Sequence, residues 1–379
     1  MARLSEWKRA FRSLGKPEIP RAERWPVNGL TAYYGRNFPS KPAPIKNISS
    51  SGIFLLGIQE PLPVGETVAI TLQLESHPEL SSELQIMIQA RVARQDEFGV
   101  GLAFLLPPGL NAGLWEVLIR GVAVVTNPER VVHVFRTLRT CLFLCRICPS
   151  GAEEAIQPLG RELEPDRATT LFKIAHAAEK LLVADPDANR MRAHPKLVAN
   201  LLRDGSWASD ELTTQLWAGL FVSSCSIDEP DESNQVFVDL LIHITPRQAA
   251  VLSHACERAL SSAPAGGDFT PASIVLGPDE IVRLTGVRDL ARNATDLAYL
   301  FNLGLIQNLV DFTSYRDFER FDITPSHLGL ELYRHCHGQR SGIDPQIMAG
   351  AREHLAVLFP SAVAQAFDPA LAPDSGQEK

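Results

Sequence analysis

The sequence predicts an α+β protein of several domains, in which a small antiparallel β-barrel is followed by a mostly α-helical region that ends in a winged-helix-like unit. Two observations carry this prediction. Between Val27 and Pro107, short runs of Val, Ile, Leu, Phe and Thr alternate with breaks that contain Pro and Gly, as in antiparallel strands. After Pro107, apolar residues recur at helical spacing instead. The length of 379 residues favours two or three domains over a single core.

Residues 1–19 are predicted to form a basic amphipathic helix. Leu4, Trp7, Phe11 and Leu14 fall on one helical stripe, and basic residues flank it. Residues 1–30 carry seven Lys or Arg against three Glu, a local net charge of +4. We expect this helix to pack on the domain that follows. A membrane surface or a partner protein is the alternative contact.

The barrel is predicted over residues 20–125, with one helix at its C-terminal end. Turn-forming segments such as Pro61-Leu-Pro-Val-Gly65 separate its strands. Evenly spaced antiparallel strands hide their edges by closing on themselves, which favours a barrel. The predicted strands are Val27–Tyr34, Ile45–Leu56, Thr67–Leu74, Leu84–Gln95 and Gly99–Leu105.

A helical domain is predicted over residues 126–263, because helical periodicity replaces the strand pattern. The expected helices, beginning with the one that closes the barrel domain, are Leu110–Val124, Pro128–Cys148, Ala152–Gly160, Pro165–Ala184, His194–Asp204, Asp210–Ser224, Ser233–Ile244 and Pro246–Ser262.

A winged-helix-like unit is predicted over residues 264–345. Two helices within 278–306 precede a polar excursion that returns at Phe321-Asp-Ile-Thr-Pro325, and the helix Ser326–His335 follows. Residues 346–379 are expected to form a C-terminal helix and a mobile tail, since the end is rich in Pro, Asp and Gly.

The most informative motif is the polar turn Asn47-Ile-Ser49-Ser-Ser-Gly52, which leads into a strand. Asn and Ser side chains can bond their own backbone, and Gly52 can take a positive φ that exposes neighbouring N–H groups. Arg21 and Arg24 lie just before Pro26-Val27 and supply forked donors that suit phosphate oxygens and the O6/N7 edge of guanine. The pattern predicts a site for an anionic nucleotide.

The stretch from Arg21 to Pro107 resembles a PilZ domain, a six-stranded barrel that binds the bacterial second messenger cyclic di-GMP. The matching pieces occur in the family's order: Arg24-Trp-Pro-Val27, Asn47-x-Ser49-x-x-Gly52, Leu62-Pro-Val-Gly65 and Gly99-Val-Gly101-Leu-Ala-Phe104. This resemblance covers roughly a quarter of the chain.

The resemblance implies that cyclic di-GMP is bound by Arg21, Arg24, Asn47, Ser49 and Gly52. In the family two arginines spaced Arg-x-x-x-Arg grip the phosphates and guanines. Arg24 matches the second arginine, but Pro20 stands where the first belongs, and the nearest arginine, Arg21, is one place out of register. A ligand-free protein-interaction scaffold, in which the turn only satisfies its own backbone, is therefore the main alternative.

Two clusters suggest metals but have simpler interpretations. Cys141, Cys145 and Cys148 have the spacing of an iron–sulfur cluster motif, yet the same spacing places them on one face of a buried helix. His335-Cys336-His337, with His327 nearby, lacks zinc-finger spacing. We predict buried thiols, no metal and no cofactor. Because no nucleophile elbow or phosphate-binding glycine loop is present, we also predict that the protein is not an enzyme.

The C-terminal half loosely resembles the helical region of abortive-infection-type proteins, through Glu211-Leu-Thr-Thr-Gln-Leu-Trp217, Val236–Pro246 and Ile323–Leu330. A winged-helix transcription regulator is a second alternative. Residues 275–340 hold seven Arg against nine acidic residues, however, which argues against a nucleic-acid surface. We expect an unknown protein partner or a homo-oligomer to use this half.

Composition and cysteine usage favour a cytoplasmic protein, and the PilZ resemblance implies a bacterial one. The chain is 45% hydrophobic and 21% charged with a net charge of −8, and no run of about 20 apolar residues suits a membrane span. Its six cysteines lack the spacing of a secreted disulfide framework. The sequence thus predicts a cyclic di-GMP sensor that transmits ligand binding to a helical interaction domain.

Overall fold

The computed structural model describes residues 22–27, 29–36, 41–58, 60–74, 84–124, 128–150, 165–228, 230, 232–262, 271–307, 320–340 and 345–359. The chain divides into two compact units, residues 1–142 and 143–379, and each is considered by itself. The division falls within helix α3 (Pro128–Ile147). The domain boundaries predicted after residues 19, 125, 263 and 345 stay predictions. The predicted N-terminal helix, the helix Ala152–Gly160 and the C-terminal tail lie outside the described residues.

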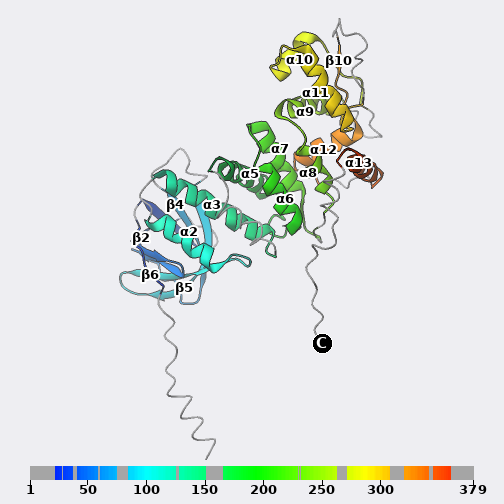
Figure 1. The fold of residues 1–379 in the computed structure, drawn as a ribbon. Helices are drawn as coiled ribbons and strands as arrows, with labels where there is room; N and C mark the ends of the chain where they lie inside the picture. Colours follow the sequence, from blue (N-terminus) through cyan, green and yellow to red (C-terminus); the bar gives the residue numbers. More distant parts are fainter. Residues whose placement is uncertain are drawn as a thin grey trace, which may run out of the picture. The chain divides into compact units, whose positions relative to one another are not determined.

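The N-terminal unit contains a closed barrel of six antiparallel strands in the order β1-β2-β3-β6-β5-β4, drawn in blue to cyan in Figure 1. This confirms the predicted barrel. Its strands are β1 (Leu30–Gly35), β2 (Lys41–Ser49), β3 (Gly52–Leu56), β4 (Thr67–Leu74), β5 (Gln85–Gln95) and β6 (Gly99–Leu105). The run Ile45–Leu56, predicted as one strand, is instead a hairpin of β2 and β3 with its turn at Ser50-Ser51.

The barrel core is formed by the inward-facing residues of all six strands. In β5, Ile86, Ile88, Ala90 and Val92 are buried, and the residues between them are half-buried or exposed. This period of two matches the pleat of a strand with one face on the core. The sequence pattern therefore sets which face of β5 meets the interior.

Helix α2 (Ala112–Val124) packs against the barrel beside β2. Trp115 anchors it, because its buried ring meets Phe104 edge-on at a centroid distance of 5.4 Å. The indole N–H of Trp115 donates to the carbonyl oxygen of Ser50 at 2.7 Å. The turn between β2 and β3 is thus attached to α2 by one partly buried hydrogen bond.

The C-terminal unit is mainly helical, and Figure 1 draws it in green to red. Within the described residues, the helices confirm the predicted ones, although α8 is shorter than the predicted helix Ser233–Ile244. Its elements are α5 (Pro165–Val183), β7 (Arg192–Ala193), α6 (Pro195–Gly205), α7 (Glu211–Ser223), β8 (Cys225–Ser226), α8 (Gln235–Leu241), α9 (Pro246–Ser261), β9 (Val275–Leu276), α10 (Pro278–Thr285), α11 (Leu290–Asn302), β10 (Phe321–Asp322), α12 (His327–Cys336) and α13 (Pro345–Leu358).

Helix α7 is the centre of this unit, since it packs against α5, α6, α8, α9 and α12. Asp210 caps its N-terminus by accepting the Thr213 backbone N–H at 3.0 Å. Nearly every residue from Thr213 to Val222 is buried, as expected of a helix enclosed on all sides. Gly219 lets the α12 backbone approach closely, because an added Cβ would lie 1.8 Å from the Cys336 carbonyl oxygen.

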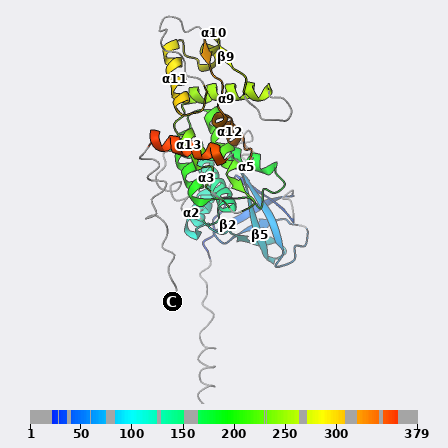
Figure 2. The same ribbon diagram turned by 90° about the vertical axis from the view of Figure 1, so that its right-hand side faces the viewer.

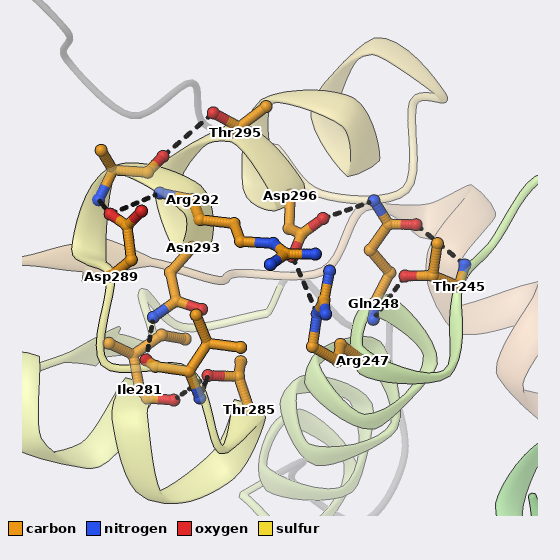
Figure 3. Close-up of polar contacts among 12 residues, drawn as sticks. Thr245, Arg247, Gln248, Ile281, Thr285, Asp289, Arg292, Asn293, Thr295 and Asp296 are labelled. Carbon is orange, nitrogen blue, oxygen red and sulfur yellow. Dashed lines mark hydrogen bonds and ion pairs between the residues drawn. The ribbon is translucent and has the colours of Figure 1, made fainter.

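Polar contacts hold α11 against the start of α9 (Figure 3). Asp296 accepts from the Gln248 side chain at 3.2 Å and pairs with Arg247 at 3.3 Å. Thr245 and Gln248 form a capping box that begins α9. In Figure 2 the axis of α9 runs across that of α11, so these contacts fix the crossing of the two helices.

The segment predicted as a winged-helix-like unit contains short antiparallel pairings. Strand β9 pairs with β10, and Ile306 forms a bridge with Pro325. The two ends of the polar excursion after α11 thus lie side by side. Its middle, residues 308–319, lies outside the described residues, and the winged-helix assignment stays a prediction.

We expect Gly219→Ala to destabilise the C-terminal unit by about 3 kcal/mol or more, because the backbones of α7 and α12 would have to separate. Denaturant unfolding measures this change. Gly350→Ala is the matched control: nothing lies within 4 Å of its Cβ position, so it should stabilise α13 by about 0.5–1 kcal/mol. Equal effects of the two substitutions would contradict the close helix crossing.

We also expect the C-terminal unit to lose stability in mild acid. His335 is buried and stacks on Phe237 at 4.6 Å, and its burial lowers its pKa from 6.5 to about 4. Between these values the unfolded chain binds the proton more readily than the folded chain, so stability falls as the pH falls through this window. Unfolding midpoints measured from about pH 7 to about pH 4.5 test this expectation. His335→Phe should flatten the pH dependence, whereas His327→Gln, at an exposed histidine of the same helix, should not.

Candidate functional site

One pocket of about 360 Å³ lies on the outer surface of the barrel. The hairpin of β2 and β3 forms one side of it, and β5 and β6 form the other. Arg24, Asn47, Ser49 and Gly52, four of the five predicted site residues, line it together. The remaining lining residues are Ala22, Ser51, Ile53, Phe54, Ala93, Arg94, Gly101, Leu102 and Ala103. Arg21, the fifth predicted residue, lies outside the described residues.

A backbone bridge places Arg24 beside the hairpin. Trp25 and Ile48 exchange two hydrogen bonds, of 2.8 Å and 3.0 Å, so that the entry segment runs antiparallel to β2. Trp25 is buried, whereas Arg24 is exposed. The guanidinium is therefore held at the pocket by its neighbour and remains open to solvent.

Asn47 lies within β2 and not in the turn itself. It pairs with Phe54 across the hairpin, at a point where β2 shifts register between Ile45 and Asn47. The Asn47 side chain is half-buried and makes no hydrogen bond within the described part of the chain. Its amide can thus donate and accept toward the pocket.

Ser49 stabilises the turn from inside. Its buried hydroxyl donates to the carbonyl oxygen of Gly52 at 3.1 Å and lies 3.2 Å from the hydroxyl of Ser51. This bond spans the hairpin turn and joins its two ends. The hydroxyl proton of Ser49, a predicted ligand-binding residue, is therefore already used in a hydrogen bond within the protein.

Gly52 is required for a different reason from the one that the sequence suggested. Gly52 is not among the described glycines with positive φ, so the prediction of a left-handed turn residue is wrong. An added Cβ would instead lie 2.1 Å from the carbonyl oxygen of Leu102, in the neighbouring strand β6. Only glycine permits β3 and β6 to pair this closely at the pocket.

The pocket has a positive lining. Arg24 and Arg94 are its charged side chains, and no Asp or Glu occurs among the described residues that line it. Lys46 adds a third cation nearby, with its ammonium 5.5 Å from the centroid of the Phe54 ring. A pocket of this charge favours an anionic ligand.

Arg94 and Phe54 were missed by the sequence reasoning. Arg94 is brought to the pocket by a bulge, since β5 shifts register between Val92 and Arg94 where it pairs with β6. The only sequence signal was an arginine near the end of a predicted strand. Its direction depends on the bulge, which strand periodicity does not reveal.

The predicted thiol stripe is buried. All six cysteines of the chain are buried and none forms a disulfide. Burial raises the pKa of Cys145 to about 11, and the neighbouring Cys148 adds to the shift. A thiol with such a pKa remains protonated and is a poor nucleophile near neutral pH.

The histidines weighed as zinc ligands do not share one face. His335 and Cys336 are buried, whereas His327 and His337 are exposed. Among the residues that the structure describes, no group of three or more His, Cys, Asp or Glu side chains could hold a metal ion. In the same residues, no helix is long and apolar enough to span a bilayer.

Comparisons with known proteins agree with this two-part architecture. Residues 21–122 match the family model described as PilZ domain, and residues 167–338 match the model described as Abortive infection alpha. A search of curated proteins returned no significant match. Among solved structures, an uncharacterized Legionella protein aligns with 14% identity over 31% of this chain and 89% of its own, with a TM-score of 0.17. At that TM-score the likeness supports no conclusion about the fold.

The closed six-stranded barrel, the residues gathered at its pocket and the family match lead to one assignment. The chain carries a PilZ domain, of the family that binds cyclic di-GMP, followed by a helical region of the abortive infection alpha type.

Proposed function

We propose that the barrel pocket binds cyclic di-GMP and that the protein is a bacterial second-messenger sensor. The observation that carries the proposal is the convergence of Arg24, Asn47, Ser49 and Gly52 on one pocket of a PilZ barrel. Its volume of about 360 Å³ lies within the range typical of small-molecule sites. The family match supports this ligand class.

The chemistry of the lining suits a cyclic dinucleotide. Arg24 is an exposed guanidinium with no ion pair in the described part of the chain, and it can form charge-assisted bonds to a phosphate. The unpaired amide of Asn47 offers a donor and an acceptor to a guanine edge. Two lining arginines oppose the two negative charges of the ligand, and no described carboxylate in the lining repels them.

Ligand binding is coupled to α2 through two contacts on the hairpin side of the pocket. Trp25, next to Arg24, lies 6.0 Å from the guanidinium of Arg120 on α2. Trp115 of the same helix holds the carbonyl oxygen of Ser50 in the turn. A ligand that tightens the entry segment on the hairpin changes the environment of both α2 residues. In this proposal α2 passes the signal toward the helical half, which binds an unidentified protein partner or a second copy of the chain.

The cytoplasm is the proposed location. Six reduced, buried cysteines fit a reducing compartment, where disulfides are rare.

A binding role also fits a PilZ domain better than catalysis does. Regulation by a ligand requires that the ligand prefer one state of the protein over another.

A ligand-free scaffold is the second candidate, and the Ser49 hydroxyl favours it. That hydroxyl is bonded to Gly52 within the turn, so part of the motif serves the protein itself. In a scaffold of this kind, the pocket would remain filled with water and the helical unit alone would bind partners. The titration below separates the two candidates.

We expect cyclic di-GMP to bind the full chain and Arg24→Ala to weaken binding by about tenfold or more, since a charge-assisted hydrogen bond contributes about 1.5–3 kcal/mol. Asn47→Ala should weaken binding less, by about fivefold, because it removes neutral hydrogen bonds. Isothermal titration calorimetry measures both changes. Arg36→Ala is the control, since Arg36 pairs with Glu66 on the surface and does not line the pocket.

Heat of binding from the wild-type protein is the decisive result. No heat at tens of micromolar ligand would reject the sensor and favour the scaffold. Equal affinities of the wild-type and Arg24→Ala proteins would place the dinucleotide outside this pocket.

We expect Trp115→Phe to uncouple α2 from the pocket. The substitution keeps an aromatic ring against Phe104 but removes the donor to Ser50, at a cost of about 1 kcal/mol in stability. Hydrogen exchange of α2 with and without cyclic di-GMP is the measurement. Ligand-induced protection of α2 should shrink in the variant, with affinity changed by less than about threefold. Unchanged protection would show that the indole bond carries no signal.

A further inference from the structure

We propose that Arg94 is an additional ligand-binding residue of the pocket, and that its guanidinium reads the O6/N7 edge of a guanine. This inference rests on the proposed function, because it concerns the same pocket and the same ligand. In the family this guanine contact belongs to an arginine pair, and here the first arginine of the pair, Arg21, is one place out of register. The inference assigns a guanine contact to Arg94 instead. The argument combines the position of Arg94, the surfaces that orient it and the state of its donors.

Four residues form a row across neighbouring strands at the pocket. Asn47 pairs with Phe54, Phe54 with Gly101, and Gly101 with Arg94. Directly paired residues of antiparallel strands project from the same face of a sheet. Arg94 and Asn47 therefore bound the same part of the pocket from opposite sides.

Two features hold the Arg94 side chain across this row. Gly101 leaves room for it, because a Cβ at position 101 would lie 3.0 Å from Cγ and 3.2 Å from Nε of Arg94. The guanidinium carbon then lies 5.2 Å from the centroid of the Phe54 ring, in a cation–π contact. The Phe54 ring and the space left by Gly101 thus orient the Arg94 guanidinium before any ligand binds.

The donors of Arg94 remain available. Within the described residues its guanidinium makes no hydrogen bond and no ion pair, and Phe54 contacts it through the ring alone. Arginine carries five N–H donors in a rigid fork. The fork matches the paired acceptors O6 and N7 of guanine, which adenine does not present. A pre-oriented guanidinium with unpaired donors at a nucleotide pocket is suited to this contact.

The test compares four variants with the wild-type full chain by calorimetric titration of cyclic di-GMP. Arg94→Ala should weaken binding by about tenfold or more, the value of one forked arginine–guanine contact. Arg94→Lys should lose most of the same affinity, because lysine keeps the charge without the planar fork. Gly101→Ala should give an intermediate loss, since it displaces Arg94 without removing it. Arg36→Ala, which removes an arginine away from the pocket, should change affinity by less than about twofold.

Each outcome decides one claim. If the wild-type protein binds and Arg94→Ala binds equally well, the role of Arg94 is rejected while the proposed function stands. If Arg94→Lys matches the wild-type protein, the contact depends on charge alone and the guanine-reading role is rejected. If the wild-type protein does not bind, the proposed function itself fails. Unfolding midpoints of the variants test whether a loss of affinity comes from a loss of the fold. The Arg94 variants should keep the wild-type midpoint, because the Arg94 side chain is exposed.

Discussion

The site depends on one short backbone pairing, the bridge between Trp25 and Ile48. The entry segment has no strand partner other than β2 among the described residues, and this bridge alone fixes where Arg24 lies. Trp25 supplies the apolar burial that holds the bridge, and Arg24 gains its place at the pocket as a result. Backbone hydrogen bonds thus position a charged side chain that forms no bond of its own with the described residues.

Much of the fold could be predicted because the barrel and the helices each follow a clear hydrophobic period. Strands β4 and β6 occur where predicted, since Pro- and Gly-bearing turns bound their apolar runs. The polar turn before β3 was recognised from Ser49, Ser51 and Gly52, but the run Ile45–Leu56 was still counted as one strand, because apolar residues lie on both sides of the turn. The predicted helices were found because apolar residues recur at helical spacing, and in the structure Asp210 and Thr245 cap two of them.

The site was predictable only in part. Arg24, Asn47, Ser49 and Gly52 lie together because the motif encodes a hairpin and its neighbouring segment. Arg94 was missed because its direction depends on a bulge in β5, and a bulge is a relation between two strands that one strand's sequence does not display. The residues of the motif indicated an anionic nucleotide, and the family resemblance supplied the identity of that nucleotide as cyclic di-GMP.

The close approach of Gly52 to Leu102 changes how the polar motif should be understood. A glycine at this position is demanded by the meeting of two strands, whether or not any guest occupies the pocket, and the Ser49 hydroxyl serves the same hairpin. Barrels that have lost their nucleotide would therefore still keep this serine and this glycine. Within such a lineage, only the arginines and the asparagine distinguish a receptor from an empty relative.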